Sequence, residues 1–179
     1  MRALFAILVC SLSAVPLSAA TRGKKLIDYG CGSPNTSYYR THLKELEKIP
    51  FDGIVLSAMK LKGKDPPDNM GWCAFGADAR FTAQDAQRAI DDLKAAESKR
   101  FTDNFIQLVT SGTVDWFDPG WSQIATNVAL LARIAQQGGC KGLMIDVEQY
   151  DRFGMWTYGT LPEKLKAAHS FEEYQVKVR

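Results

Sequence analysis

Two acidic residues near the end of one apolar segment are the strongest candidates for chemistry. Asp146 and Glu148 lie in the run KGLMIDVEQY, with one residue between them. Side chains two apart on an extended strand point to the same face. Two carboxylates held together repel each other, and the pKa of one of them then rises. Such an acid can protonate the leaving oxygen of a glycosidic bond, so we assign Glu148 as general acid and Asp146 as the residue that orients it or holds its proton.

The same pair has simpler interpretations. An acidic pair at the end of a strand can also cap the next loop, hold a cation or remain solvated. Met144 would share the face of Asp146. Ile145 and Val147 would lie on the opposite face, which we expect to pack against helices.

Aromatic residues gather in the segments that follow the expected strands. Their faces can stack on the C–H surfaces of a sugar, and they bury a large contact area. The residues concerned are Trp72 after the second strand, Trp116 and Trp121 after the third, and Tyr150 and Trp156 after the fourth. We expect one or two of these side chains to be exposed in a cleft, while the others can form small satellite cores under the loops. Asp28 and Gln107 are weaker candidates, because each is a polar residue within an apolar strand and could face the interior.

The elements that position these residues alternate along the chain. Short apolar runs predict strands at 25–29, 52–57, 105–109 and 142–147. Apolar residues at helical spacing predict helices at 37–49, about 82–99 and 121–137. Thr82 with Asp85, and Ser170 with Glu173, have the spacing of capping boxes that open helices. A long segment at 59–80 shows no periodicity, which is typical of a functional loop.

Strands alternating with helices require a mainly parallel sheet with right-handed crossovers. An eight-stranded barrel and an open doubly wound sheet both fit. The glycines at 30–32 have the wrong spacing for a dinucleotide fingerprint. Long loops after each strand favour an α/β fold of the (β/α)8 TIM-barrel type, whose site lies at those loops. A full barrel needs about 250 residues, so we expect only the first four β/α units here, as a fragment or, less simply, a self-assembling half-barrel.

The first 20 residues have the character of an export signal. A basic Arg2 precedes an apolar run at 3–9, and Ser18-Ala19-Ala20 offers small residues at the cleavage spacing. We therefore expect a secreted or periplasmic protein, with a signal peptide at 1–20 and a barrel half at 21–179. The apolar run is too short to span a bilayer comfortably.

Composition narrows the partners. The chain has 22 basic and 20 acidic side chains, a formal charge of +2, which gives no reason to expect nucleic acid or an anionic membrane as a partner. We expect no cofactor and no metal, since no CxxC or Cys/His cluster occurs. Three cysteines follow the signal, Cys31, Cys73 and Cys140, and an odd number leaves at least one thiol unpaired.

Two resemblances extend this interpretation. The run Gly142-Leu-Met-Ile-Asp146-Val-Glu148 resembles in part the fourth-strand D-x-D-x-E motif of chitinase-like glycoside hydrolases, with Met144 in place of one Asp. KLIDYG at 25–30, PFDGI at 50–54, VDWFD at 114–118 and GGCKG at 138–142 are similar to a group of uncharacterised exported bacterial proteins. That second resemblance implies a glycosidase-like TIM barrel.

The function expected from these observations is hydrolysis of a poly- or oligosaccharide outside the cytoplasm. The alternative is a barrel that binds carbohydrate without cleaving it, or one that is degenerate or truncated and has no activity of its own.

Overall fold

The computed structural model describes residues 23–30, 32–60, 68–112, 114–147 and 155–179 as a mixed α/β fold. Its four strands form one sheet in the order β1-β2-β3-β4, and each neighbouring pair is parallel. The strands are β1 (Ile27–Asp28), β2 (Gly53–Leu56), β3 (Phe105–Val109) and β4 (Gly142–Asp146). The helices are α1 (Thr36–Leu46), α2 (Met70–Cys73), α3 (Ala83–Ala95), α4 (Trp121–Gln137), a 3₁₀ turn (Tyr158–Thr160), α5 (Glu163–Ala168) and α6 (Phe171–Val178).

The helices begin where local hydrogen bonds favour it. Both predicted capping boxes form, Thr82 with Asp85 at α3 and Ser170 with Glu173 at α6. Asn35 caps α1 by accepting from the backbone N–H of Tyr38 at 2.8 Å.

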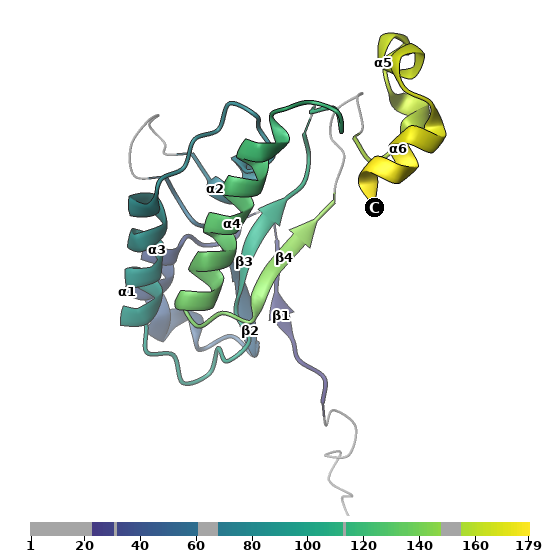
Figure 1. Cartoon of the computed structure of the whole chain (residues 1–179). Coiled ribbons are helices and arrows are strands. Elements are labelled where there is room, and N and C mark those ends of the chain that lie inside the picture. The colour runs from purple at the N-terminus through teal and green to yellow at the C-terminus, as the bar shows by residue number, and fades with distance from the viewer. Residues whose placement is uncertain (1–22, 31, 61–67, 113, 148–154) are drawn as a thin grey trace, which may run out of the picture.

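The long helices α1, α3 and α4 cover one face of the sheet (Figure 1). Ile54 and Leu56 of β2 and Ile106 and Leu108 of β3 point to that face and form the core with the helices. Each helix contributes a buried apolar residue to this core, Tyr39 from α1, Ile90 from α3 and Leu131 from α4. Alternate strand residues point to the opposite face, where Val55, Gln107 and Val109 are also buried.

Most of the predicted elements are confirmed, and one was missed. The ranges 105–109 and 121–137 match β3 and α4. Helix α2 lies inside the segment predicted as a loop. It is a single turn, too short for a periodic pattern to reveal it. Its N-cap Asn69 accepts from the backbone N–H groups of Gly71 and Trp72.

The outer face of β4 corrects one prediction. Ile145 and Val147 do not pack against helices, because 59% and 61% of their surfaces are exposed. Strand β4 lies at the edge of the sheet, and α6 packs elsewhere, against the segment after β3 (Figure 1). There Tyr174 donates to Asp115 Oδ2 at 2.5 Å and its ring meets that of Phe117 edge to face.

Residues 1–20, predicted to be a signal peptide, lie outside the described residues. Across the part of the chain that is described, none of the helices combines the length and apolar character needed to traverse a bilayer.

Candidate functional site

Asp146 is the candidate acidic residue that the structure describes. It is the last residue of β4, and it is half-buried. The hydroxyl of Tyr29, which directly follows β1, donates to Asp146 Oδ2. Strands β1 and β4 are the two edges of the sheet, so this contact joins its opposite sides. The sheet must therefore curl strongly at the end where its strands finish.

The backbone of Asp146 is fixed by the residue that follows β3. Its carbonyl oxygen accepts from the N–H of Thr110 at 2.7 Å and from Thr110 Oγ1 at 3.1 Å. The carbonyl of the same Thr110 accepts from Trp156 Nε1 at 3.1 Å. One residue therefore holds an aromatic ring next to the end of the acidic strand. The Trp156 side chain is 42% exposed, so part of its ring remains open to solvent.

Three of the four tryptophans form one cluster. Trp116 stacks on Trp121 with ring centroids 4.3 Å apart, and Trp156 meets Trp116 edge to face at 5.3 Å. The indole N–H of Trp116 donates to the carbonyl of Met155 at 2.6 Å, and that of Trp121 donates to the carbonyl of Asp115 at 2.8 Å. The stacked faces of Trp116 and Trp121 are therefore occupied by each other, which leaves Trp156 as the accessible member.

Trp72 lies apart from this cluster, on α2, with 37% of its surface exposed. A buried polar network sets the position of that helix. Asn69 Nδ2 donates to Ser57 Oγ at 3.0 Å, and Ser57 Oγ donates to Gln107 Oε1 at 3.1 Å. Gln107 thus faces away from the helices, as its position in the strand predicted, and it holds the segment before Trp72 over β3.

Asp28 is placed differently from Tyr29. It pairs in register with Ile54, and residues paired in a parallel sheet point to the same face. Because Ile54 belongs to the helix-covered core, Asp28 points toward the α1 side. It lines a cavity of about 220 Å³ there with Ser33 and Pro34. The structure therefore does not bring Asp28 to Asp146, and Tyr29 is the residue that sequence reasoning missed. The period-two alternation could have indicated it.

Glu148 and Tyr150, the predicted general acid and one predicted aromatic contact, lie outside the described residues. Among the residues that are described, no three His, Cys, Asp or Glu side chains gather as the ligands of a metal ion would.

The C-terminal helices add a second aromatic group beside the tryptophans. The ring of Tyr158 meets those of Phe171 and Tyr174 at 5.3 and 5.4 Å. Burial, together with the carboxylate of Asp115, raises the pKa of Tyr174 above its ordinary value, so this hydroxyl stays a donor to Asp115. The contact fixes α6 against the segment that carries Trp116.

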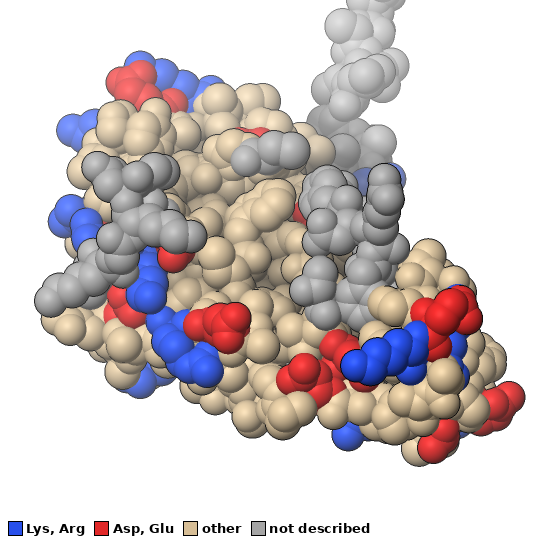
Figure 2. Space-filling view, turned by 90° about the horizontal axis from the view of Figure 1, so that it is seen from above, with Lys and Arg blue, Asp and Glu red and all other residues tan. Residues whose placement is uncertain are grey.

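Viewed from above, this end of the molecule is hollowed at its centre, and the visible surface there is mostly neither acidic nor basic (Figure 2). Charged side chains gather toward its margin. A surface of this kind suits a neutral ligand better than a polyanion.

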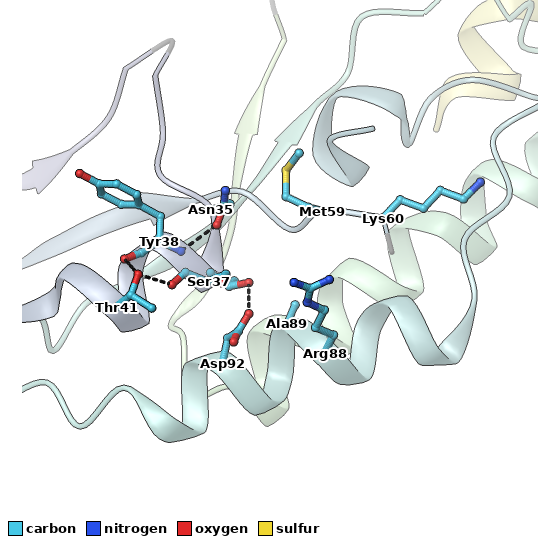
Figure 3. A pocket seen from close by; sticks show the side chains of 10 residues that line it. Asn35, Ser37, Tyr38, Thr41, Met59, Lys60, Arg88, Ala89 and Asp92 are labelled. Atoms are coloured by element: carbon cyan, nitrogen blue, oxygen red, sulfur yellow. Dashed lines mark hydrogen bonds between the residues drawn. The ribbon is translucent and has the colours of Figure 1, made fainter. Parts of the chain in front are cut away.

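A separate hollow of about 390 Å³ lies between α1, α3 and the segment after β2 (Figure 3). Asp92 at its floor accepts from Thr36 Oγ1 at 3.2 Å and pairs with Arg40 Nε at 3.0 Å. These contacts tie α1 to α3. Arg88 extends from α3 toward Met59, while Lys60 points away from Asp92. The carboxylate of Asp92, the acidic group of this hollow, is thus already engaged in contacts that hold the helices together.

Comparison with known proteins found none that is similar to this chain. No family model, no curated protein and no solved structure matches this chain.

Proposed function

We propose that this chain forms the first four units of a (β/α)8-type barrel and that the carboxyl ends of its strands bind a glycan. The strand order supports the barrel. When parallel strands follow one another in sequence order with right-handed crossovers, every helix falls on the same face. A doubly wound sheet instead reverses its order at a switch point and places helices on both faces.

The contact between Tyr29 and Asp146 is the observation that carries the proposal. It brings two segments 117 residues apart together at the end of the sheet where barrel enzymes keep their sites. A hydroxyl that donates to a carboxylate fixes its orientation. In the proposed reaction Asp146 is the partner carboxylate that Tyr29 orients. Glu148, two residues further on, protonates the leaving oxygen of the glycosidic bond, while water supplies the hydroxyl group that the anomeric carbon gains and the proton that restores the acid.

Trp156 provides the contact surface for the sugar. Its ring is partly open and is held by Thr110, the residue that also holds Asp146. Stacking of a sugar ring on an indole buries apolar C–H surface without using the N–H donor, which Thr110 already accepts.

We further propose that the chain is exported by its first 20 residues and works outside the cytoplasm. Completion of the barrel requires a C-terminal half or a second copy.

Hydrolysis by matched variants tests this proposal. Release of reducing ends from a panel of α- and β-linked oligosaccharides identifies a substrate. On it, Glu148→Gln is expected to lower kcat by about 10²- to 10⁴-fold, because the proton donor is lost. Tyr29→Phe is expected to lower kcat/KM about 10- to 150-fold, since a hydrogen bond to a charged group contributes about 1.5–3 kcal/mol.

Tyr38→Phe is the matched control for Tyr29→Phe. Tyr38 is 47% exposed on α1 and lies away from Asp146. Its loss of a hydroxyl should leave kcat/KM unchanged. Full activity of Glu148→Gln on every cleaved glycan would sink the catalytic proposal.

Carbohydrate binding without cleavage is the second candidate, favoured by the tryptophan cluster close to the end of the strand that carries Asp146. It predicts that glycan affinity survives Glu148→Gln but falls with Trp156→Ala. Binding titrations that reveal no turnover would decide for it.

A further inference from the structure

A cavity of about 310 Å³ lies between α6 and the segment around Trp156. Its walls are largely carbon. Its apolar and aromatic lining comes mainly from Met155, Trp156, Tyr158, Phe171, Tyr174 and Val178, and the polar residues Gln175 and Arg179 also line it. The volume exceeds that of a two-ring aromatic group, so a small organic molecule fits within it.

The polar atoms of its aromatic walls are already used outside it. Trp156 Nε1 donates to the carbonyl of Thr110 at 3.1 Å, and Tyr158 OH donates to the carbonyl of His169 at 3.3 Å. Tyr174 OH donates to Asp115 at 2.5 Å. With these three groups engaged elsewhere, the aromatic walls offer ring surfaces rather than hydrogen-bond partners. A sugar hydroxyl placed against them would lose its hydrogen bonds to water without replacement.

The walls are also held in place before any ligand binds. Burial and the contact to Asp115 fix the ring of Tyr174, which is 5% exposed. The edge-to-face contacts of Tyr158 with Phe171 and Tyr174 set the angle between the rings. Phe171 and Trp156 nevertheless remain 47% and 42% exposed, which is costly for large apolar side chains in water. A flat apolar ligand would remove that exposed area from water.

We propose that this cavity binds a flat apolar or aromatic group and serves as the aglycone subsite of the site at Asp146. Trp156 forms its boundary, and Thr110 connects that boundary to Asp146. A glycoside can therefore place its sugar ring toward Asp146 and its aryl group in the cavity. Binding of the apolar group stands on the cavity alone, while its role as aglycone subsite rests on the proposed function.

Fluorescence titration of the full chain with 2-naphthol, an uncharged two-ring probe, tests the binding. Val178→Asp and Val176→Asp are matched variants two positions apart on α6. Val178 lines the cavity, whereas Val176 does not and is 75% exposed. We expect saturable one-to-one binding to the unchanged chain, weakened about tenfold or more by Val178→Asp, because a carboxylate at the wall must lose water. Val176→Asp should change the dissociation constant less than about twofold.

Near-ultraviolet circular dichroism tests whether both variants keep their aromatic packing. If Val178→Asp loses it, Phe171→Ala replaces that variant and should weaken binding through lost contact area. Equal effects of the two Asp variants, or no saturable binding, would overturn the cavity proposal.

The aglycone role has its own measurement. KM for a 2-naphthyl glycoside should rise in Val178→Asp, while KM for the methyl glycoside of the same sugar stays constant. If naphthol binds but no glycoside is cleaved, the proposed hydrolysis fails and the apolar site stands. If glycosides are cleaved but the two KM values move together, the aglycone role fails and hydrolysis stands.

Discussion

At the scale of single residues, the alternation of side chains between the two faces of a strand decides which of them meet. Asp28 and Tyr29 are neighbours, yet one lies on the α1 side and the other reaches Asp146 across the sheet. Gln107 is buried because Ser57 and Asn69 both donate to its side-chain oxygen. The side chains of Gln107 and Asp146 therefore have partners that only another strand or loop supplies.

Cys140 carries a residue-scale prediction. Burial raises the pKa of its thiol to about 11, from 9.0 for a free thiol. The reactive thiolate should therefore be about 100-fold scarcer near pH 8 than in the unfolded chain. Mass spectrometry of the Cys140 peptide after iodoacetamide treatment should show correspondingly slow alkylation in the native protein. Equal rates in the native and urea-unfolded protein would contradict the burial argument.

The same shift fixes a direction for stability. A thiol whose folded pKa is raised stabilises the fold fully below its unfolded pKa, and this contribution disappears as pH rises between about 9 and about 11. Burial also raises the pKa of the Tyr39 hydroxyl, which acts in the same direction at alkaline pH.

At the scale of elements, the short helix α2 shows how a loop acquires structure. Four residues form a helical turn because Asn69 satisfies the first N–H groups and Met70 is fully buried beneath. Gly71 lies so close to β3 that a Cβ there would stand 2.3 Å from the carbonyl oxygen of Gln107. The turn that carries Trp72 therefore packs directly against β3.

Gly71→Ala tests this close approach. The added methyl must displace backbone, so we expect a loss of about 1–3 kcal/mol in the free energy of unfolding. For a chain of this size that is a fall in Tm of about 3–10 °C. Gly159→Ala is the control, because nothing lies within 4 Å of a Cβ at that exposed position. Equal Tm values for the two variants, measured by circular dichroism, would count against a tight contact between α2 and β3.

At the scale of the whole molecule, β1 and β4 have no further strand beside them among the described residues. Ile145 of β4 and Val147 just after it are exposed, and Leu26 before β1 is 59% exposed. Parallel edges with unpaired backbone groups and apolar side chains invite pairing with another chain. None of the described helices covers Ile145, so its side chain remains exposed although it is apolar.

Self-association of the 179-residue chain is the prediction at this scale. Sedimentation velocity over a range of concentrations should show oligomers that grow with concentration. Val147→Lys should reduce them, because a charge at an edge opposes pairing. Val176→Lys, equally charged but on α6, should not. A monodisperse monomer at every concentration would refute association through the edge.

The order of elements, most of their boundaries and both capping boxes could be predicted from sequence, because they depend on neighbours within a few residues. The position of Asp146 near the end of a strand also followed from the local pattern. The alternation along the strand could indicate the face on which Tyr29 lies, but not its contact with Asp146. That contact and the exposure of Ile145 depend on how far the sheet curls and on which helix lies beside its edge.

The tryptophans show the same division. Their place after the strands follows from sequence alone, since it depends only on where the strands end. Trp116 and Trp121 stack within one short segment. Tertiary structure decided that Trp156 joins them at its ring edge, because the contacts of Trp116 with Met155 and Trp156 join segments about 40 residues apart. By itself the sequence determined an α/β chain of alternating units with acidic and aromatic residues at one end. Only the packing of distant segments decided which of those residues meet, because the contacts of Asp146 with Tyr29 and of Trp156 with Trp116 join residues far apart in the sequence.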